Sequence, residues 1–177
     1  EDEEIKKTFT EMLVALVAGL VLMFTVLVLE FNSFRTSLRL LSAIPLSLTG
    51  VLIGLFIAGQ PLSFTAFLGI IALGGVLINH GILLLDVLDK RRGESGDPKS
   101  IVLDAATSRL RPIILTTITT VIGMIPLTLV SEMWAPLAFT IGFGLIYGTL
   151  LTLIFIPLLS FRRLSKEVAL ENRIEQY

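Results

Sequence analysis

The chain has 177 residues, of which 54% are hydrophobic and 16% are charged, and its formal net charge at pH 7 is -1. A mean hydropathy of +0.87 lies well above that of soluble domains and indicates a protein that is embedded in lipid. The balanced charge excludes a broad cationic surface for nucleic acid, and the lack of cysteine excludes disulfides and thiolate metal sites.

Five apolar runs follow one another along the chain, at residues 9–29, 40–58, 62–85, 112–130 and 134–159. Each is long enough to cross a bilayer core of about 30 Å as a helix. The alternating pattern of a membrane β-barrel is not present, and backbone polar groups in hydrocarbon must be satisfied within their own segment. The sequence therefore predicts an all-α, polytopic bundle with five spans, forming a single transmembrane domain over residues 1–177.

The distribution of Lys and Arg between the runs predicts the orientation of the bundle. Basic residues fill the connections after the first and third runs and the tail 160–177, whereas the opposite side has only Lys6 and Lys7. Positively charged loops remain on the cytoplasmic side. We therefore expect the N-terminus outside and the C-terminus in the cytoplasm.

The longest polar connection, residues 86–111, divides into two parts. Its first part is charged and rich in turn-forming residues, which predicts a cytoplasmic loop. The second part, residues 100–110, has apolar residues near helical spacing and Ser100 as a candidate N-cap, so we expect a short interfacial helix that anchors the fourth span. Pro45 and Pro126 lie inside spans and predict kinks there.

Small residues four apart recur in three of the runs, and such pairs let membrane helices approach closely. The pairs are Ala15 with Gly19, Gly50 with Gly54, and Gly144 with Gly148. They predict a packed bundle without indicating which helices touch.

Polar residues at membrane depth are concentrated in the third and fourth runs. Asn79 and Asp86 are seven residues apart and share one helix face, while Thr116, Thr119, Thr120 and Gly123 form a stripe on the next helix. Ionisable groups cost at least about 2.5 kcal/mol at this depth, so they face protein or water and are candidates for function. Two such stripes facing each other predict a hydrogen-bonded seam.

Proton coupling needs a group whose charge changes with conformation, and His80 and Asp86 are the candidates by chemistry. Two interpretations stay open for each residue. Asp86 either couples protons or is solvated and paired with Lys90 or Arg91, and His80 either senses protons or is a neutral, hydrogen-bonded residue of the bundle. No nucleophile elbow surrounds a Ser, no second intramembrane aspartate can pair with Asp86, and a single His cannot supply a usual metal site, so we expect no enzyme activity. The sequence gives no sign of a cofactor.

Several motifs in order along the chain resemble the resistance-nodulation-division (RND) transporters, in particular their hydrophobe and amphiphile efflux branch. They are LEFNSFR at 29–35, IPL at 44–46, GGVLINHGILLLD at 74–86 and RLRPIILTT at 109–117, followed by Gly123 and Pro126. The resemblance covers almost the whole chain. It implies an inner-membrane proton antiporter that exports small amphiphilic compounds and works as a homotrimer. The five spans predicted here would correspond to the last five spans of such a transporter.

The resemblance also implies roles for single residues. Arg109 and Thr116 match the arginine and the relay threonine of the family, whereas the relay lysine is replaced by Asn79, so a lysine relay is excluded. The family's paired aspartates and its porter domain lie in parts that this sequence does not contain. Asn79, His80, Asp86, Arg109 and Thr116 are therefore the candidate residues for the second-half side of a proton relay.

The acidic start at residues 1–4, placed outside ahead of a span, leads us to expect a piece of a longer polypeptide. A small natural five-span protein is the alternative. Two other functions stay open: a protein-translocation auxiliary membrane subunit of related fold, and a non-transporting membrane scaffold.

Overall fold

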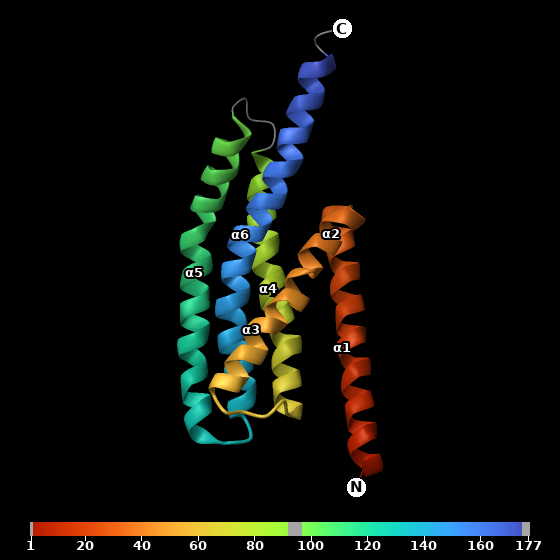
Figure 1. Cartoon of the computed structure of the whole chain (residues 1–177), viewed down its shortest axis with the longest axis vertical. Coiled ribbons are helices and arrows are strands. Elements are labelled where there is room, and N and C mark those ends of the chain that lie inside the picture. Colours follow the sequence, from red (N-terminus) through yellow and green to blue (C-terminus); the bar gives the residue numbers. More distant parts are fainter. Residues whose placement is uncertain (1, 92–96, 175–177) are drawn as a thin grey trace.

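The described part of the chain is helical. The computed structural model describes residues 2–91 and 97–174, and these residues contain no strand. The helices are α1 (Asp2–Phe31), α2 (Phe34–Leu41), α3 (Ala43–Ile57), α4 (Phe64–Lys90), α5 (Pro98–Val130) and α6 (Ala135–Ile174). They run up and down one long axis, with the two termini at opposite ends (Figure 1). The all-α prediction is confirmed.

Five helical stretches in the described residues are long and apolar enough to cross a membrane. They are Lys6–Phe31, Phe34–Ile57, Phe64–Lys90, Lys99–Val130 and Ala135–Leu158. Each overlaps one of the five runs predicted from the sequence. The shortest have 24 residues, or about 36 Å at 1.5 Å per residue, which exceeds the hydrocarbon thickness of about 30 Å.

A break at Ser42 divides the second span into α2 and α3. Pro45 lies in the first turn of α3 and has no backbone N–H to continue the helical ladder back to Leu41. The Ser42 N–H instead bonds to the Leu38 carbonyl at 3.0 Å and closes α2. The kink expected at Pro45 therefore takes the form of a break three residues earlier, whereas Pro126 lies within α5, which remains one helix.

The connection between the third and fourth spans differs from the expectation. Residues 100–110 are the first turns of α5, which continues through Pro112 into the span, so they form no separate interfacial helix. Asp97, and not Ser100, caps α5, because its side chain accepts a hydrogen bond from the Lys99 N–H at 3.4 Å. Helix α4 extends to Lys90, and α6 extends to Ile174 across most of the expected tail.

The centre of the bundle is α6, which packs against α3, α4 and α5. Its contact with α3 is made through glycines: Gly50 and Gly54 lie against the side chains of Tyr147 and Phe143, close to where these leave the α6 backbone. Neither glycine leaves space for a Cβ atom. The glycine pair on α3 therefore sets how closely the two helices approach.

The contact of α6 with α4 uses the second glycine pair. Gly144 lies against Leu73, and a Cβ at Gly148 would come 2.6 Å from Leu77 Cδ2. Leu73 and Leu77 are fully buried there, with 0% and 1% of their surface exposed. Two of the three small-residue pairs predicted from the sequence thus lie at close helix contacts.

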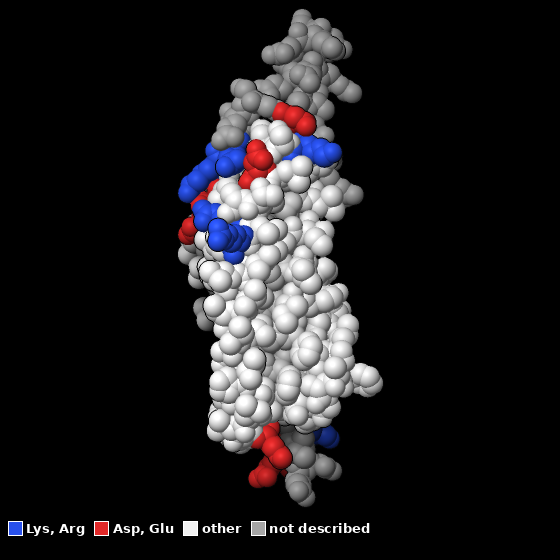
Figure 2. All heavy atoms as spheres, turned by 90° about the vertical axis from the view of Figure 1, so that its left-hand side faces the viewer, with Lys and Arg blue, Asp and Glu red and all other residues white. Residues whose placement is uncertain are grey.

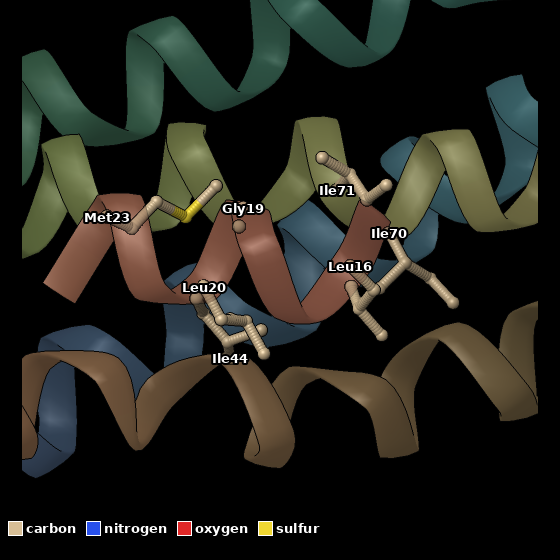
Figure 3. A pocket seen from close by; sticks show the side chains of 8 residues that line it. Leu16, Gly19, Leu20, Met23, Ile44, Ile70 and Ile71 are labelled. Carbon is tan, nitrogen blue, oxygen red and sulfur yellow. The ribbon is translucent and has the colours of Figure 1, made fainter. Parts of the chain in front are cut away.

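Helix α1 is only weakly embedded in the bundle. It contacts α2 and α4, and about half of its large apolar side chains are exposed. A narrow apolar crevice separates it from α3 and α4, with Gly19 between the side chains of Leu16, Met23 and Ile71 (Figure 3). A Cβ at Gly19 would lie 3.9 Å from Ile71 Cγ2, so the predicted Ala15–Gly19 pair makes no close helix contact within the chain.

Charged side chains gather at the two ends of the molecule. The face in Figure 2 has a broad middle band without charge, and most of its Lys and Arg side chains lie toward the end that carries the α4–α5 connection. The last turn of α4 and the first turns of α5 contribute Lys90, Lys99, Arg109 and Arg111 to this end. The uncharged band is the surface that a bilayer core requires.

Candidate coupling site

His80 is the most deeply buried ionisable side chain that the sequence singled out. Only 3% of its surface is exposed. The buried face of α4 is built from residues three and four apart, including Leu73, Leu77 and Leu84, and His80 belongs to this face. A buried imidazole needs hydrogen-bond partners, because an unpaired polar group in the interior costs about 1–3 kcal/mol.

The first partner of His80 comes from α5. Its Nε2 atom lies 3.2 Å from the hydroxyl oxygen of Thr116. The same hydroxyl is within donating distance of two backbone carbonyls of its own helix, that of Ile113 at 2.9 Å and that of Pro112 at 3.1 Å. Thr116 is exposed at the outer side of α5. The His80–Thr116 contact therefore joins a buried group to the surface of the bundle.

The second partner comes from α6. The Nδ1 atom of His80 lies 3.5 Å from the hydroxyl oxygen of Thr149, which is itself 3.0 Å from the hydroxyl oxygen of Thr117 on α5. Thr149 and Thr117 are buried, with 3% and 7% of their surface exposed. Four side chains from three helices thus form one connected polar cluster, which we call the His80 cluster: His80, Thr116, Thr117 and Thr149.

The seam predicted between the two stripes is not formed within the described residues, because Thr116 is the one member that bonds across to the other helix, and its partner on α4 is His80. Asn79 is exposed and makes no side-chain hydrogen bond to the described residues, whereas its neighbour His80 faces Thr116. Adjacent residues on a helix point about 100° apart, so a stripe through Asn79 and a stripe through His80 meet different neighbours. On α5, Thr119 is exposed and bonds only to carbonyls of its own helix.

Asp86 and Arg109 lie outside the His80 cluster. The Oδ2 atom of Asp86 accepts a hydrogen bond from Lys90 Nζ at 2.8 Å, and these side chains are 44% and 72% exposed. This is the ion pair that the sequence offered as one interpretation of Asp86. Arg109 is half-buried on α5, and the described residues give it no ion pair.

Thr149 was not among the residues selected from the sequence. The candidates were ionisable residues and helix faces with several polar residues in the third and fourth apolar runs, whereas Thr149 is a single hydroxyl in the fifth run. The signal that could have found it is the general tendency of Ser and Thr in membrane helices to hydrogen-bond across to a neighbouring helix.

Comparison with protein families shows where this chain belongs. The family described as "AcrB/AcrD/AcrF family" matches residues 1–162. The chain belongs to the AcrB/AcrD/AcrF family. These are RND transporters, so the resemblance in the sequence motifs is confirmed at the level of the family, while the comparisons do not fix the branch.

Several known proteins are similar to this chain over most of its length. The swarming motility protein SwrC of Bacillus subtilis is 32% identical over 160 residues, which are 88% of the chain and 15% of SwrC. The cobalt-zinc-cadmium resistance protein CzcA of Cupriavidus metallidurans is 33% identical, over 89% of the chain and 15% of CzcA. The multidrug resistance protein MdtC of Salmonella schwarzengrund is 32% identical, over 94% of the chain and 17% of MdtC.

A solved structure described as a heavy metal efflux pump has the same arrangement of helices. Its second crystal form matches with a TM-score of 0.79 and 31% sequence identity, over 90% of this chain and 16% of the pump. The first crystal form gives a TM-score of 0.76. This chain therefore spans about one sixth of the length of the relatives that it matches.

Proposed function

We propose that this chain is part of the membrane domain of a proton-driven RND efflux transporter, with its spans corresponding to the last five of the pump. The observation that carries the proposal is the contact of buried His80 with Thr116, in a bundle of the AcrB/AcrD/AcrF family. Such a cluster puts a titratable imidazole within one hydroxyl of the bundle surface. A transporter uses a group of this kind to link protonation to conformation.

The group that exchanges protons with this site would come from outside the chain. In the described residues His80 meets only hydroxyls, and the carboxylates implied by the family resemblance belong to a first-half span. Thr116 and Asn79 are exposed and able to meet such a span. A charged carboxylate would accept hydrogen bonds from them, with the Thr116 proton turning to it from the Ile113 carbonyl. The neutral acid would bind them less strongly, because hydrogen bonds to charged groups are the stronger ones.

The proposal includes an inner-membrane location, a homotrimer in the whole pump, and a cytoplasmic end formed by the α4–α5 connection and the C-terminus. The support for the cytoplasmic end is the concentration of Lys and Arg there, and the support for the location and the trimer is the match to the family of RND transporters. The exposed apolar surfaces of α1 and α5 need contact with lipid or with further helices. Transport, and not catalysis, is the function that we assign to this arrangement.

For the substrate we propose small amphiphilic or hydrophobic compounds, on the motifs at 29–35 and 109–117 that resemble that branch. Export of metal cations is the second candidate, because relatives of equal similarity are named for resistance to cobalt, zinc and cadmium. A protein-translocation subunit and a membrane scaffold remain possible outcomes of the test below.

The test uses the whole transporter that contains this segment, reconstituted in proteoliposomes with a pH gradient. We expect Thr116→Ala and Asn79→Ala each to lower dye export and the coupled proton flux about tenfold or more, since each removes a hydrogen bond to a charged partner. Thr25→Ala is the control, because Thr25 bonds only to the Val21 carbonyl of its own helix.

Unchanged export and proton flux in both Thr116→Ala and Asn79→Ala would remove the coupling site from the proposal. Export of cobalt or zinc in place of dyes would favour the second substrate class. If neither dyes nor metal cations are exported, a bound polypeptide would favour the protein-translocation subunit, and a stable complex with partner proteins would favour the membrane scaffold.

A further inference from the structure

The hydroxyl of Thr149 occupies a particular place, because it is the link between His80 and the interior of the bundle. Thr149 belongs to α6, the helix around which α3, α4 and α5 pack. Its oxygen lies 3.5 Å from His80 Nδ1 and 3.0 Å from Thr117 Oγ1. It therefore contacts His80 on the side of the ring opposite Thr116.

The number of protons in the His80 cluster decides which group donates and which accepts in each of its hydrogen bonds. Each hydroxyl has one proton, and a neutral imidazole has one donor and one acceptor nitrogen. Thr116 has a backbone carbonyl at 2.9 Å, that of Ile113, to receive its proton. If Thr116 donates to that carbonyl, its oxygen can accept a hydrogen bond from His80 Nε2–H. The other ring nitrogen, Nδ1, then accepts from the Thr149 hydroxyl, whose oxygen accepts in turn from the Thr117 hydroxyl. Every proton in this chain then has an acceptor.

The opposite direction leaves a buried proton without a partner. His80 Nδ1–H would donate to Thr149, and Thr149 would donate to Thr117. Thr117 makes no other side-chain hydrogen bond to the described residues, so its own proton would have no acceptor. Since Thr117 is only 7% exposed, water cannot easily supply one, and an unpaired buried donor costs about 1–3 kcal/mol. The first direction is therefore the stable one.

We propose that Thr149 is a positioning residue, which holds His80 in the tautomer with its proton on Nε2 so that this proton points toward Thr116. Thr117 supports Thr149 from behind. No charged side chain forms a hydrogen bond or ion pair with His80 within the described residues. Along the helices, Asp86 is six residues from His80 and Arg109 is seven residues from Thr116. Hydroxyl geometry alone thus selects the tautomer.

This inference deepens the proposed coupling site and rests on the proposed function for its effect on export. The orientation of the imidazole itself does not depend on that function. Placing the link on α6 means that a shift of α6 against α4 would change the hydrogen bonding at Nδ1 without any movement of Thr116. The core helix and the outer helix α5 would then both control the same proton.

The chain contains one histidine, which makes the tautomer directly measurable. Solid-state NMR of the chain labelled with [15N]histidine, in lipid bilayers, distinguishes protonated from unprotonated ring nitrogens of His80. We expect the proton on Nε2 in the wild type and in Thr149→Ser. In Thr149→Val, which keeps the shape and removes the hydroxyl, we expect the tautomer ratio to change about tenfold, since one hydrogen bond is lost.

Thr152→Val is the matched control, because Thr152 is also buried on α6 but donates to the Gly148 carbonyl, at 2.7 Å. It should leave the His80 signals unchanged. A wild-type proton on Nδ1 would overturn the inference without any variant being needed. Equal ratios in the wild type and Thr149→Val would also overturn it, provided that backbone shifts show the same fold.

Export by the whole transporter separates this inference from the proposed function. If His80→Ala exports normally while the tautomer responds to Thr149→Val, His80 has no coupling role but the positioning by Thr149 holds. If His80→Ala abolishes export and Thr149→Val changes neither export nor the tautomer, the coupling role stands and the positioning role falls.

Discussion

Replacing Gly50 by alanine tests the close packing of α3 on α6. An ideal Cβ at this position would lie 2.7 Å from Tyr147 Cδ1 and still closer to Tyr147 Cβ and Cγ, whereas real Cβ atoms do not approach within 3.0 Å. The Cβ and Cγ atoms of Tyr147 are fixed to the backbone and to the ring, so the side chain cannot move its end away. The two helices must separate instead.

The magnitude follows from two opposing effects. Overpacking of a close contact costs about 1–3 kcal/mol, and a site without a flexible neighbour belongs near the upper end of that range. Alanine in place of glycine gains about 0.5–1 kcal/mol inside a helix. We expect Gly50→Ala to lower the free energy of unfolding by about 1–2 kcal/mol. Gly142→Ala is the control, because Gly142 has no atom within 4 Å of its ideal Cβ, and it should be neutral or gain up to about 1 kcal/mol.

The assay is reversible unfolding of the chain in bicelles by steric trapping, which gives the free energy of unfolding of a membrane protein without denaturant. The two variants should differ by about 1–3 kcal/mol, the sum of the loss at one site and the gain at the other. Equal stabilities of Gly50→Ala and Gly142→Ala would refute the close contact of α3 with α6.

Three further substitutions test local features. Thr140 is fully buried and its hydroxyl has no hydrogen-bond partner among the described residues, so Thr140→Val should raise the free energy of unfolding by about 1 kcal/mol in the same assay; a loss would mean that the hydroxyl is satisfied. Asp97→Ala should remove about 1 kcal/mol from the first turn of α5, measured as faster amide exchange, with Asp97→Ser retaining protection. Asp86→Asn breaks a pair with Lys90 that is mostly exposed, and stability should change by less than about 0.5 kcal/mol at low salt; a larger loss would show that the pair is shielded in the membrane.

The spans could be predicted because they depend on local composition. A run of about 20 apolar residues has to become a helix in lipid, whatever its neighbours are. The same holds for the family, since its motifs are short stretches whose residues follow one another in the sequence. The ends of the helices were harder to predict from the sequence. Residues 100–110 were expected to form an interfacial helix because of their apolar spacing and the candidate N-cap Ser100, but α5 runs from its cap at Asp97 through Pro112 without a break.

The site was predicted in part. The presence of His80 and Thr116 at membrane depth was sufficient to select both, and the structure brings them together at 3.2 Å. Their functional roles stay predictions. Asn79 was paired with Asp86 because a spacing of seven residues places two side chains on one face, but that rule does not say which face meets a neighbouring helix. The exposed position of Asn79 shows that the contact face lies one residue further along.

The amino-acid sequence by itself determined that the chain is helical, crosses a bilayer several times and has polar groups at depth, because hydrophobicity and backbone hydrogen bonding act within each segment. The tertiary structure decided which polar groups meet. Thr149 is 69 residues from His80 along the chain, and it reaches the imidazole only because the glycines of α6 let α4 approach closely. Contacts of that kind depend on helix rotation and distance, which no single segment encodes.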